Sequence, residues 1–435
     1  MSKMNFVVIG AALIVFASVA TALRFGSMPI GIGEVAVILA FIWALRYRKA
    51  MLYIQHPIML FWMSFIATVA VAMAVGTLKG ASSLHTAAAY LYAGCFSLMA
   101  LACLEQVSKQ QFISFIKALS IIPGIMLFIP FLCFLTDSTD LAALFGINTE
   151  YPSRLSAWST NPNQLALLLL PVPFWLLAVY RNTKWQGLHW LRYFGLLWAF
   201  FFLGISVRSD ALLLAWIIGL PVLTAVAWAW IKPFNWKLFA TTLAAFVLAF
   251  GAFKFMIDGP GREHLAKTEA VVVGAVSSLF GEKPSQTSGR TFAPGKSDSV
   301  MGVGFDQNKS GVRKTLWIHS YEVWLQSPLI GHGPGAFSYL DDPAKKEEAH
   351  NLGFDILTQA GIVGVLLFAA LYLWLMFKAC QARDPFSLTV LVVLLIFSGA
   401  HFMLRQPVFS LYMIICALAV KQGIFTALRE KPQPN

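Results

Sequence analysis

The residues with the clearest chemical potential lie at 350–364, where the sequence reads His-Asn, nine residues, and then Gly-x-x-Gly. His350 ends a long polar loop and begins an apolar segment, so we expect its imidazole at a membrane–water boundary, where it can exchange protons with a water-borne substrate. The positive end of a helix dipole favours the neutral imidazole, the form that accepts a proton. We therefore predict that His350 is catalytic, and that Gly361 and Gly364 let the helix pack closely against a neighbour.

Isolated arginines at the ends of apolar segments are candidates for binding an anionic group. Arg208 lies in a hairpin of a few residues, Arg313 precedes a helical pattern, and Arg154 precedes the next apolar segment. Arg405, between two apolar segments, is a fourth such residue. The planar guanidinium donates two parallel hydrogen bonds and so suits phosphate or diphosphate, although an arginine can also simply anchor a helix end at the membrane surface. We expect the first three to bind substrate.

The Asn-Pro-Asn sequence at 161–163 opens an apolar segment and predicts a helix start. Proline is favoured in the first helical turn, and an asparagine before it can cap free N–H groups. A helix N-terminus that faces a cavity favours anions. Asn161 and Asn163 are therefore expected to help bind an anionic substrate.

Other motifs indicate structure rather than chemistry. The glycine-rich sequence at 328–335 predicts a tight backbone bend; it lacks the Gly-Lys-Ser/Thr of a nucleotide loop, and we expect His332 within it to be structural. There is no Asp-x-Asp and no histidine pair at helical spacing, so we predict no metal and no cofactor. The five cysteines lie in or beside apolar segments and are expected to be small packing residues.

These side chains must be positioned by elements that fit the composition. Of 435 residues, 58% are hydrophobic and 12% are charged, whereas a soluble globular protein has about 25% charged residues. Apolar runs of about 20 residues recur, and a barrel would alternate with a period of two instead. The sequence predicts an all-α polytopic integral membrane protein. We attribute the net charge of +12 to loops that orient the helices, not to nucleic-acid binding.

About 12 membrane-spanning helices are expected from the apolar runs, at 5–23, 28–45, 58–78, 84–103, 112–136, 162–180, 192–207, 211–231, 238–257, 351–377, 386–403 and 408–427. Lys and Arg concentrate in one set of short loops, which predicts that both termini are cytoplasmic. We divide the chain into spanning helices 1–9 at 1–257, a large periplasmic loop with short amphipathic helices at 258–350, and helices 10–12 with a cytoplasmic tail at 351–435.

Taken together, the motifs resemble the O-antigen ligase and polymerase superfamily of the glycosyltransferase C group, over roughly residues 150–410. The histidine motif is similar to the ligase signature. The resemblance rests on Arg154 with Asn161-Pro162-Asn163, Ser206-x-Arg208, Arg313-x3-Trp317, the turn at 328–335, and His350-Asn351-x9-Gly361-x-x-Gly364.

The resemblance implies an inner-membrane ligase that moves a glycan from undecaprenyl diphosphate to lipid A–core at the periplasmic face, with inversion and without a metal. It implies that Arg208 and Arg313 hold the diphosphate and that His350 acts at the acceptor hydroxyl. Ser288-Gly289-Arg290 supplies a second possible clamp, so either Arg290 or Arg313 is the main one. The expected partners are the lipid-linked donor, the lipid A–core acceptor and membrane lipid.

Alternative functions share some of these features. An O-antigen polymerase would use the same donor with a second lipid-linked glycan as acceptor, and a protein O-oligosaccharyltransferase would use a Ser or Thr. A transporter of lipid-linked sugar should have repeated halves, broken helices and ionisable groups near the bilayer centre. We find no clear repeat, so transport is the least favoured of these functions.

Overall fold

The computed structural model describes residues 53–75, 83–136, 142, 145–148, 154–159, 161–181, 188–256, 309–336 and 349–426, with a few isolated positions before residue 53. Within these residues the regular structure is helical and contains no strand, which confirms the all-α prediction. The expected spans at 5–23 and 28–45, and most of the loop at 258–350 including Arg290, lie outside the described residues.

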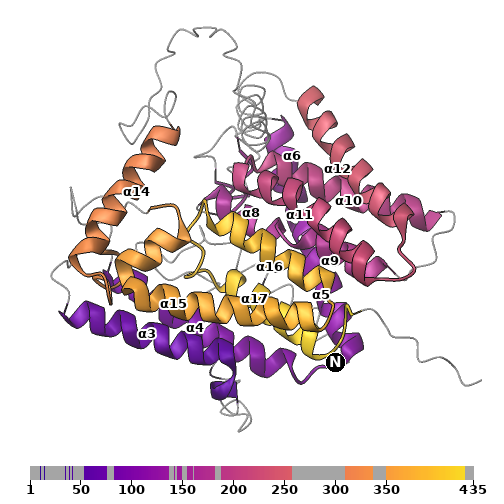
Figure 1. The fold of residues 1–435 in the computed structure, drawn as a ribbon. Helices are drawn as coiled ribbons and strands as arrows, with labels where there is room; N and C mark the ends of the chain where they lie inside the picture. The colour runs from indigo at the N-terminus through magenta and orange to yellow at the C-terminus, as the bar shows by residue number, and fades with distance from the viewer. Residues whose placement is uncertain are drawn as a thin grey trace, which may run out of the picture.

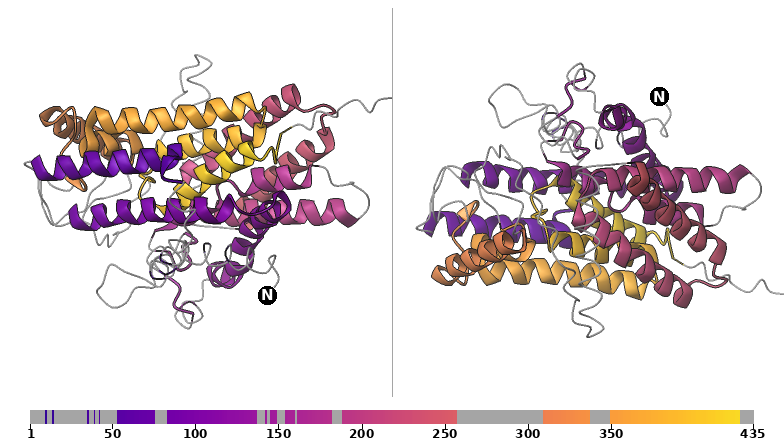
Figure 2. Two further views of the ribbon diagram at one scale, coloured as in Figure 1. Left: turned by 90° about the horizontal axis from the view of Figure 1, so that it is seen from below. Right: turned by 90° about the horizontal axis from the view of Figure 1, so that it is seen from above.

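The helices lie side by side in an elongated bundle (Figures 1 and 2), in which α3, α4 and α15 run along nearly the same axis. In chain order the helices are α3 (Pro57–Val75), α4 (Ser83–Leu104), α5 (Lys109–Met126), α6 (Phe128–Thr136), α8 (Pro162–Leu169), α9 (Val172–Tyr180), α10 (Leu188–Ser206), α11 (Asp210–Trp230), α12 (Trp236–Met256), α14 (Lys309–Gln326), α15 (Leu352–Gln381), α16 (Pro385–Ser398) and α17 (Pro407–Lys421).

Seven helical segments in the described part of the chain are long and apolar enough to cross a membrane: Pro57–Val75, Ser83–Leu104, Lys109–Phe134, Pro162–Tyr180, Asp210–Trp230, Trp236–Phe253 and Leu352–Gln381. The chain is therefore a multi-pass membrane protein. The expected spans at 192–207, 386–403 and 408–427 correspond to α10, α16 and α17, which are not among the seven. With 14 and 15 residues, α16 and α17 are shorter than the ~20 residues that a span needs. The total of about 12 spans stays a prediction.

Hydrogen bonds at the helix termini define one end of the bundle, which we call the Arg208 end. The Arg154 Nε donates to the Val207 carbonyl oxygen at 3.1 Å, and the Leu155 N–H donates to the Ser206 carbonyl oxygen at 3.0 Å. The segment before α8 therefore lies against the turn between α10 and α11, which contains Arg208.

At the opposite end of the bundle, which we call the Arg181 end, the termini of other helices lie together. The Arg181 guanidinium follows α9, donates to the carbonyl oxygens of Phe425 and Thr426 at 2.5 and 2.8 Å, and lies 5.7 Å from the Phe386 ring. Because Phe386 lies in the first turn of α16, this helix starts at the Arg181 end. It packs along α11, where Val393 lies against Gly219, and from there runs toward the start of α11 at the Arg208 end.

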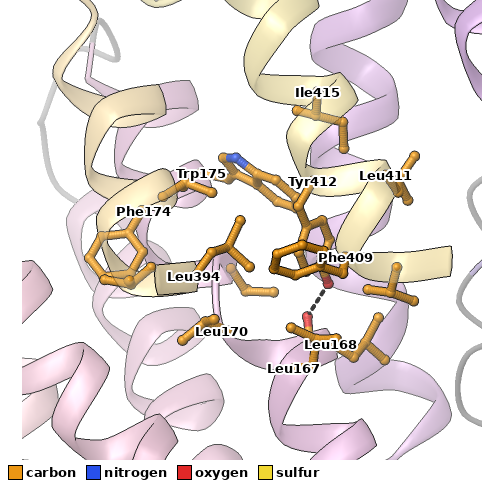
Figure 3. Packing of buried hydrophobic residues seen from close by; sticks show 14 of the residues in the cluster. Leu167, Leu168, Leu170, Phe174, Trp175, Leu394, Phe409, Leu411, Tyr412 and Ile415 are labelled. Atoms are coloured by element: carbon orange, nitrogen blue, oxygen red, sulfur yellow. Dashed lines mark hydrogen bonds between the residues drawn. The ribbon is translucent and has the colours of Figure 1, made fainter. Parts of the chain in front are cut away.

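At the break between α8 and α9, side chains from other helices donate hydrogen bonds to backbone carbonyl oxygens. Pro171 lacks an N–H and interrupts the helical hydrogen bonds. Two carbonyl oxygens at the break accept side-chain donors from other helices: Tyr412 Oη donates to Leu168 at 2.8 Å (Figure 3), and Trp216 Nε1 donates to Leu170 at 2.9 Å. Such internal partners are needed because lipid offers none.

The helix that follows His350 is itself broken. Gly361 has φ 61° and ψ −160°, a conformation outside the helical region, so α15 consists of two helical pieces. The prediction that Gly361 lies on a continuous helix face is therefore wrong. Gly364 does lie in the helix, and a Cβ at this position would come within 3.5 Å of the Phe65 ring on α3, close enough for the packing that we expected.

The glycine-rich turn at 327–336 fills this break and supplies the missing backbone partners. The N–H groups of Ile362 and Val363 donate to carbonyl oxygens of the turn at 2.9 and 3.1 Å. In return, the N–H groups of His332 and Gly333 donate to carbonyl oxygens of α15 at 2.9 and 3.0 Å. The predicted bend therefore serves as the partner of a broken helix.

The Gln359 side chain completes this junction. Its Oε1 accepts from Tyr90 Oη on α4 at 2.7 Å and from the Gly335 N–H at 3.3 Å. His332 is buried, and its Nε2 lies 3.0 Å from the Val323 carbonyl oxygen. These contacts give His332 the structural setting that we expected.

Candidate active site

Arg154, Asn163 and Arg208 come together at one end of the bundle, as the sequence predicted for a common site. Arg154 Nη2 donates to Asn163 Oδ1 at 3.1 Å, while Arg154 Nε holds the Val207 carbonyl oxygen next to Arg208. Arg208 lies close enough to Arg154 for the two positive charges to repel each other. Two guanidinium groups held this close favour the binding of an anion with more than one negative charge.

The Arg208 guanidinium is the most constrained cation of this group. The residue is only 8% exposed, and its Nε and Nη1 have no hydrogen-bond partner among the described residues. The Phe134 and Phe253 rings lie 5.9 and 5.8 Å from its Cζ. Burial, assisted by the neighbouring Arg154 charge, lowers the Arg208 pKa to about 10. The group therefore remains cationic at neutral pH and has two buried donors that no described residue uses.

Asn161 and Asn163 have distinct structural roles. Asn161 is the N-cap of α8, and its Oδ1 accepts from the Asn163 N–H at 2.9 Å. Asn163 in turn holds Arg154 through its own side-chain oxygen. Direct binding of substrate by these asparagines stays a prediction, whereas their orientation of the helix start and of Arg154 is visible in the structure.

His350 is exposed and has φ 51°, a left-handed conformation that is uncommon for residues other than glycine. Asn351 follows as the N-cap of α15, and its Oδ1 accepts from the N–H groups of Gly353 and Phe354 at 2.9 and 3.2 Å. The predicted helix start at the histidine motif is therefore confirmed.

The Asn351 side chain also fixes which end of the bundle carries His350. Its Nδ2 donates to the Gly399 carbonyl oxygen at 3.0 Å. Gly399 caps the far end of α16 from Phe386, and that far end is the Arg208 end. His350 and Arg208 therefore belong to the same end of the bundle, although they come from different halves of the chain.

Left-handed backbone accumulates at this end. The positive-φ residues other than glycine in the described part of the chain are Ala157, Arg208, His350 and Arg383. The first three belong to the Arg208 end, and Arg383 follows α15 at the Arg181 end. Each such residue costs on the order of 1–3 kcal/mol, and such strain clusters at functional sites.

Of the two remaining predicted arginines, the structure describes only the backbone of Arg313, and Arg290 lies outside the described residues. The Arg313 backbone belongs to α14, one turn before Trp317, and its side chain lies outside the described part. Trp317 stacks on Phe354 of α15 with ring centroids 5.8 Å apart, so α14 lies against the helix that His350 precedes. The choice between the two arginines stays open.

Two residues at this end were not among the predicted site residues. Asp355 is buried in the first turns of α15, where its carboxylate accepts backbone N–H groups on both sides of His350. His401 is buried in the turn after Gly399, with its ring 4.9 Å from Phe397. A signal for Asp355 was present: an acid at the start of a strongly apolar segment is expensive in a membrane protein.

Residues 193–369 match the model of a family described as O-antigen ligase. The sequence has no match among curated proteins. The matched segment contains Arg208, the α14 backbone and His350, whereas Arg154 and the α8 cap precede it. The match confirms the family resemblance that the motifs predicted. Over residues 193–369, this multi-pass membrane protein is similar to the O-antigen ligase family.

Proposed function

We propose that the protein is an O-antigen ligase that transfers a glycan from undecaprenyl diphosphate to lipid A–core at the periplasmic face of the inner membrane. The observation that carries the proposal is the buried Arg208 guanidinium next to Arg154, because its Nε and Nη1 have no hydrogen-bond partner among the described residues. This pair lies at the end of the bundle to which His350 belongs. The family match supports the same reaction class.

The donor needs a site for a dianionic diphosphate and a path for its polyprenyl tail. Arg208 and Arg154 provide positive charge at the level where the spanning helices end, which is where a lipid headgroup lies. Arg313, or Arg290 in its place, would complete this clamp. Charge-assisted hydrogen bonds from several arginines stabilise a diphosphate without requiring a cation.

In the proposed reaction, an acceptor hydroxyl oxygen attacks the anomeric carbon of the donor glycan, while the bond from that carbon to the diphosphate oxygen breaks. The bonding electron pair leaves with undecaprenyl diphosphate, and the anomeric configuration inverts. Arginines that stabilise the developing negative charge are each worth about 10²–10³ in rate.

His350 accepts the acceptor proton during this attack and then releases it to water. Its exposed position lets the imidazole reach a hydroxyl group from the aqueous side. General-base assistance of this kind is worth about 10²–10⁴ in rate. Holding two lipid-linked substrates in one membrane plane adds the advantage of proximity.

Reconstitution with purified substrates tests the proposal. The protein is supplied with an undecaprenyl-diphosphate glycan and three acceptors: lipid A–core, a second lipid-linked glycan, and a protein with acceptor serines. We expect sugar on lipid A–core. Transfer to the second glycan would instead indicate a polymerase, and transfer to protein an oligosaccharyltransferase. Movement of intact donor across the vesicle, without transfer, would indicate a transporter.

Two variants separate the catalytic step from folding in this assay. His350→Ala should insert normally and lose transfer by about 10²–10⁴. His189→Ala replaces an exposed histidine at the start of α10, near the Arg181 end, and should keep full activity. Normal transfer by His350→Ala would remove this residue from the mechanism.

Excess EDTA tests the arginine clamp as the source of charge stabilisation. Because the guanidinium groups are part of the chain, the reconstituted protein should transfer glycan at an undiminished rate in EDTA. Loss of activity that added Mg²⁺ restores would show that a divalent cation, and not arginine alone, neutralises the leaving diphosphate.

A further inference from the structure

Asp355 is a buried carboxylate beside His350 that has no role in the proposed reaction. The residue is 1% exposed. Its Oδ1 accepts from the Ala349 N–H at 3.1 Å, and its Oδ2 accepts from the Asn351 N–H at 3.4 Å. The two N–H groups belong to the residues immediately before and after His350, so one carboxylate spans the histidine.

The conformation of His350 explains why these N–H groups converge. A left-handed residue, here with φ 51°, turns the neighbouring backbone N–H groups toward a common point. Concavities of this kind bind anions in proteins. In this turn the anion is the Asp355 side chain, which lies one helical turn further along the same chain.

The left-handed turn needs such a partner to persist. It is unfavourable for a residue other than glycine. The two backbone hydrogen bonds to the Asp355 carboxyl group oppose that cost. Asn351 fixes the same turn from the other side through Gly399.

We propose that Asp355 is a positioning residue, which holds the backbone around His350 so that the imidazole presents one orientation to the acceptor hydroxyl. This role rests on the proposed transfer reaction. Asp355 is buried and bonded to backbone, so it acts through His350 and not on substrate.

A matched control exists at the Arg181 end. Asp384 is 0% exposed and caps α16, where its Oδ1 accepts from the N–H groups of Phe386 and Ser387 at 3.1 and 3.0 Å. It is therefore a second buried carboxylate that binds two backbone N–H groups, distant from His350 along the bundle. Asp384→Asn reproduces the chemical change without touching the site.

The kinetic test compares Asp355→Asn with Asp384→Asn in reconstituted protein of matched thermal stability. A small displacement of a catalytic group can cost about 10²-fold. Asp355→Asn should lower kcat by that order, while its affinity for undecaprenyl diphosphate stays unchanged. Asp384→Asn should leave both quantities unchanged. Equal kcat values for Asp355→Asn and wild type, or a loss confined to donor affinity, would overturn the positioning role.

Hydrogen exchange tests the same contact without any activity. In the wild type the N–H groups of Ala349 and Asn351 should exchange slowly. The amide of Asp355→Asn keeps one acceptor oxygen and loses the other, so it should accelerate exchange of at least one of these N–H groups by about tenfold. Unchanged exchange would overturn the carboxylate contact itself. If exchange accelerates but wild-type protein transfers no glycan to any acceptor, the proposed function fails while the structural contact stands.

Discussion

Arg208 combines burial, positive charge and two donors without a partner in the described part of the chain. These properties explain why a lysine would be a poor substitute. A guanidinium presents a planar fork to a phosphate, whereas an ammonium acts as a compact point charge on a flexible stem. The two phenylalanine rings near its Cζ also suit a planar guanidinium better than a compact ammonium.

We therefore expect Arg208→Lys to lower the transfer rate by about 10²-fold, the lower bound for loss of a donor that stabilises the transition state. The measurement is kcat/KM for the lipid-linked donor. Arg383→Lys is the control, because Arg383 shares the left-handed backbone, with φ 51°, but is exposed at the Arg181 end. Full activity in Arg208→Lys would show that charge alone suffices.

Because Arg208 is buried, the affinity for undecaprenyl diphosphate should change with pH in the alkaline range. The Arg208 pKa is lowered to about 10, so the free protein begins to lose this proton well below the usual range of arginine. A bound diphosphate favours the charged form and raises the pKa again. Binding of undecaprenyl diphosphate at a pH near 10 should therefore take up protons, and its affinity should fall as pH rises through this value.

Calorimetry in two buffers with different ionisation enthalpies measures this proton uptake. At neutral pH the uptake should vanish, because Arg208 is fully charged in both free and bound protein. Arg208→Lys should change the pH at which uptake appears. Affinity that stays constant through pH 10 in the wild type would argue against Arg208 as a diphosphate ligand.

At the residue scale, sequence reasoning identified side chains whose chemistry is visible in their type. It identified Arg154, Asn163 and Arg208 as members of one site, and the structure brings them together. It did not identify Asp355, because that carboxylate acts on backbone N–H groups whose convergence depends on the φ angle of His350.

Among the helices, α15 depends on backbone hydrogen bonds from a turn that lies outside the helix itself. The break at Gly361 leaves backbone groups that the turn at 327–336 completes. A broken helix is also expected in a transporter, where the freed backbone lines a cavity. Here protein backbone occupies the break, so this feature does not favour transport.

Gly361→Ala tests whether the junction needs glycine. A Cβ at Gly361 would lie 2.4 Å from the Leu329 carbonyl carbon, and a positive φ is itself unfavourable for alanine. We expect the variant to unfold at a lower temperature in detergent and to lose transfer, since the turn cannot dock. Gly251→Ala, where a Cβ meets nothing within 4 Å, should be stabilising by about 0.5–1 kcal/mol.

At this scale the sequence predicted where most described helices begin. The caps at Asn161 and Asn351 and the proline at 162 follow local rules. The break at Gly361 could not be predicted in the same way, because the apolar pattern continues through it. A non-helical residue is tolerated inside a membrane-spanning helix because the turn at 327–336 supplies the backbone hydrogen bonds that the break leaves open.

The bundle as a whole places the exposed His350 and the Arg208 donors, which have no partner among the described residues, at one end. The contacts of Arg181 and Asp384 lie at the other end. The distribution of Lys and Arg in the loops predicts that the Arg181 end faces the cytoplasm. This assignment decides whether the site meets periplasmic acceptors.

Cysteine labelling with a membrane-impermeant maleimide tests this orientation. The native Cys380 is exposed near the end of α15, at the Arg181 end, and should react in inverted vesicles but not in intact spheroplasts. In a Cys380→Ser background, Phe145→Cys introduces a thiol at an exposed position. Residue 145 lies at the Arg208 end, because its carbonyl oxygen accepts from Trp158 Nε1 at 2.8 Å.

The Phe145→Cys thiol should react in intact spheroplasts and not in sealed inverted vesicles. Detergent solubilisation should expose both positions and serves as the control for reactivity. The opposite pattern would place His350 and Arg208 on the cytoplasmic side, where lipid A–core displayed in the periplasm is out of reach. Because labelling requires no substrate, it tests orientation independently of every assay of glycan transfer.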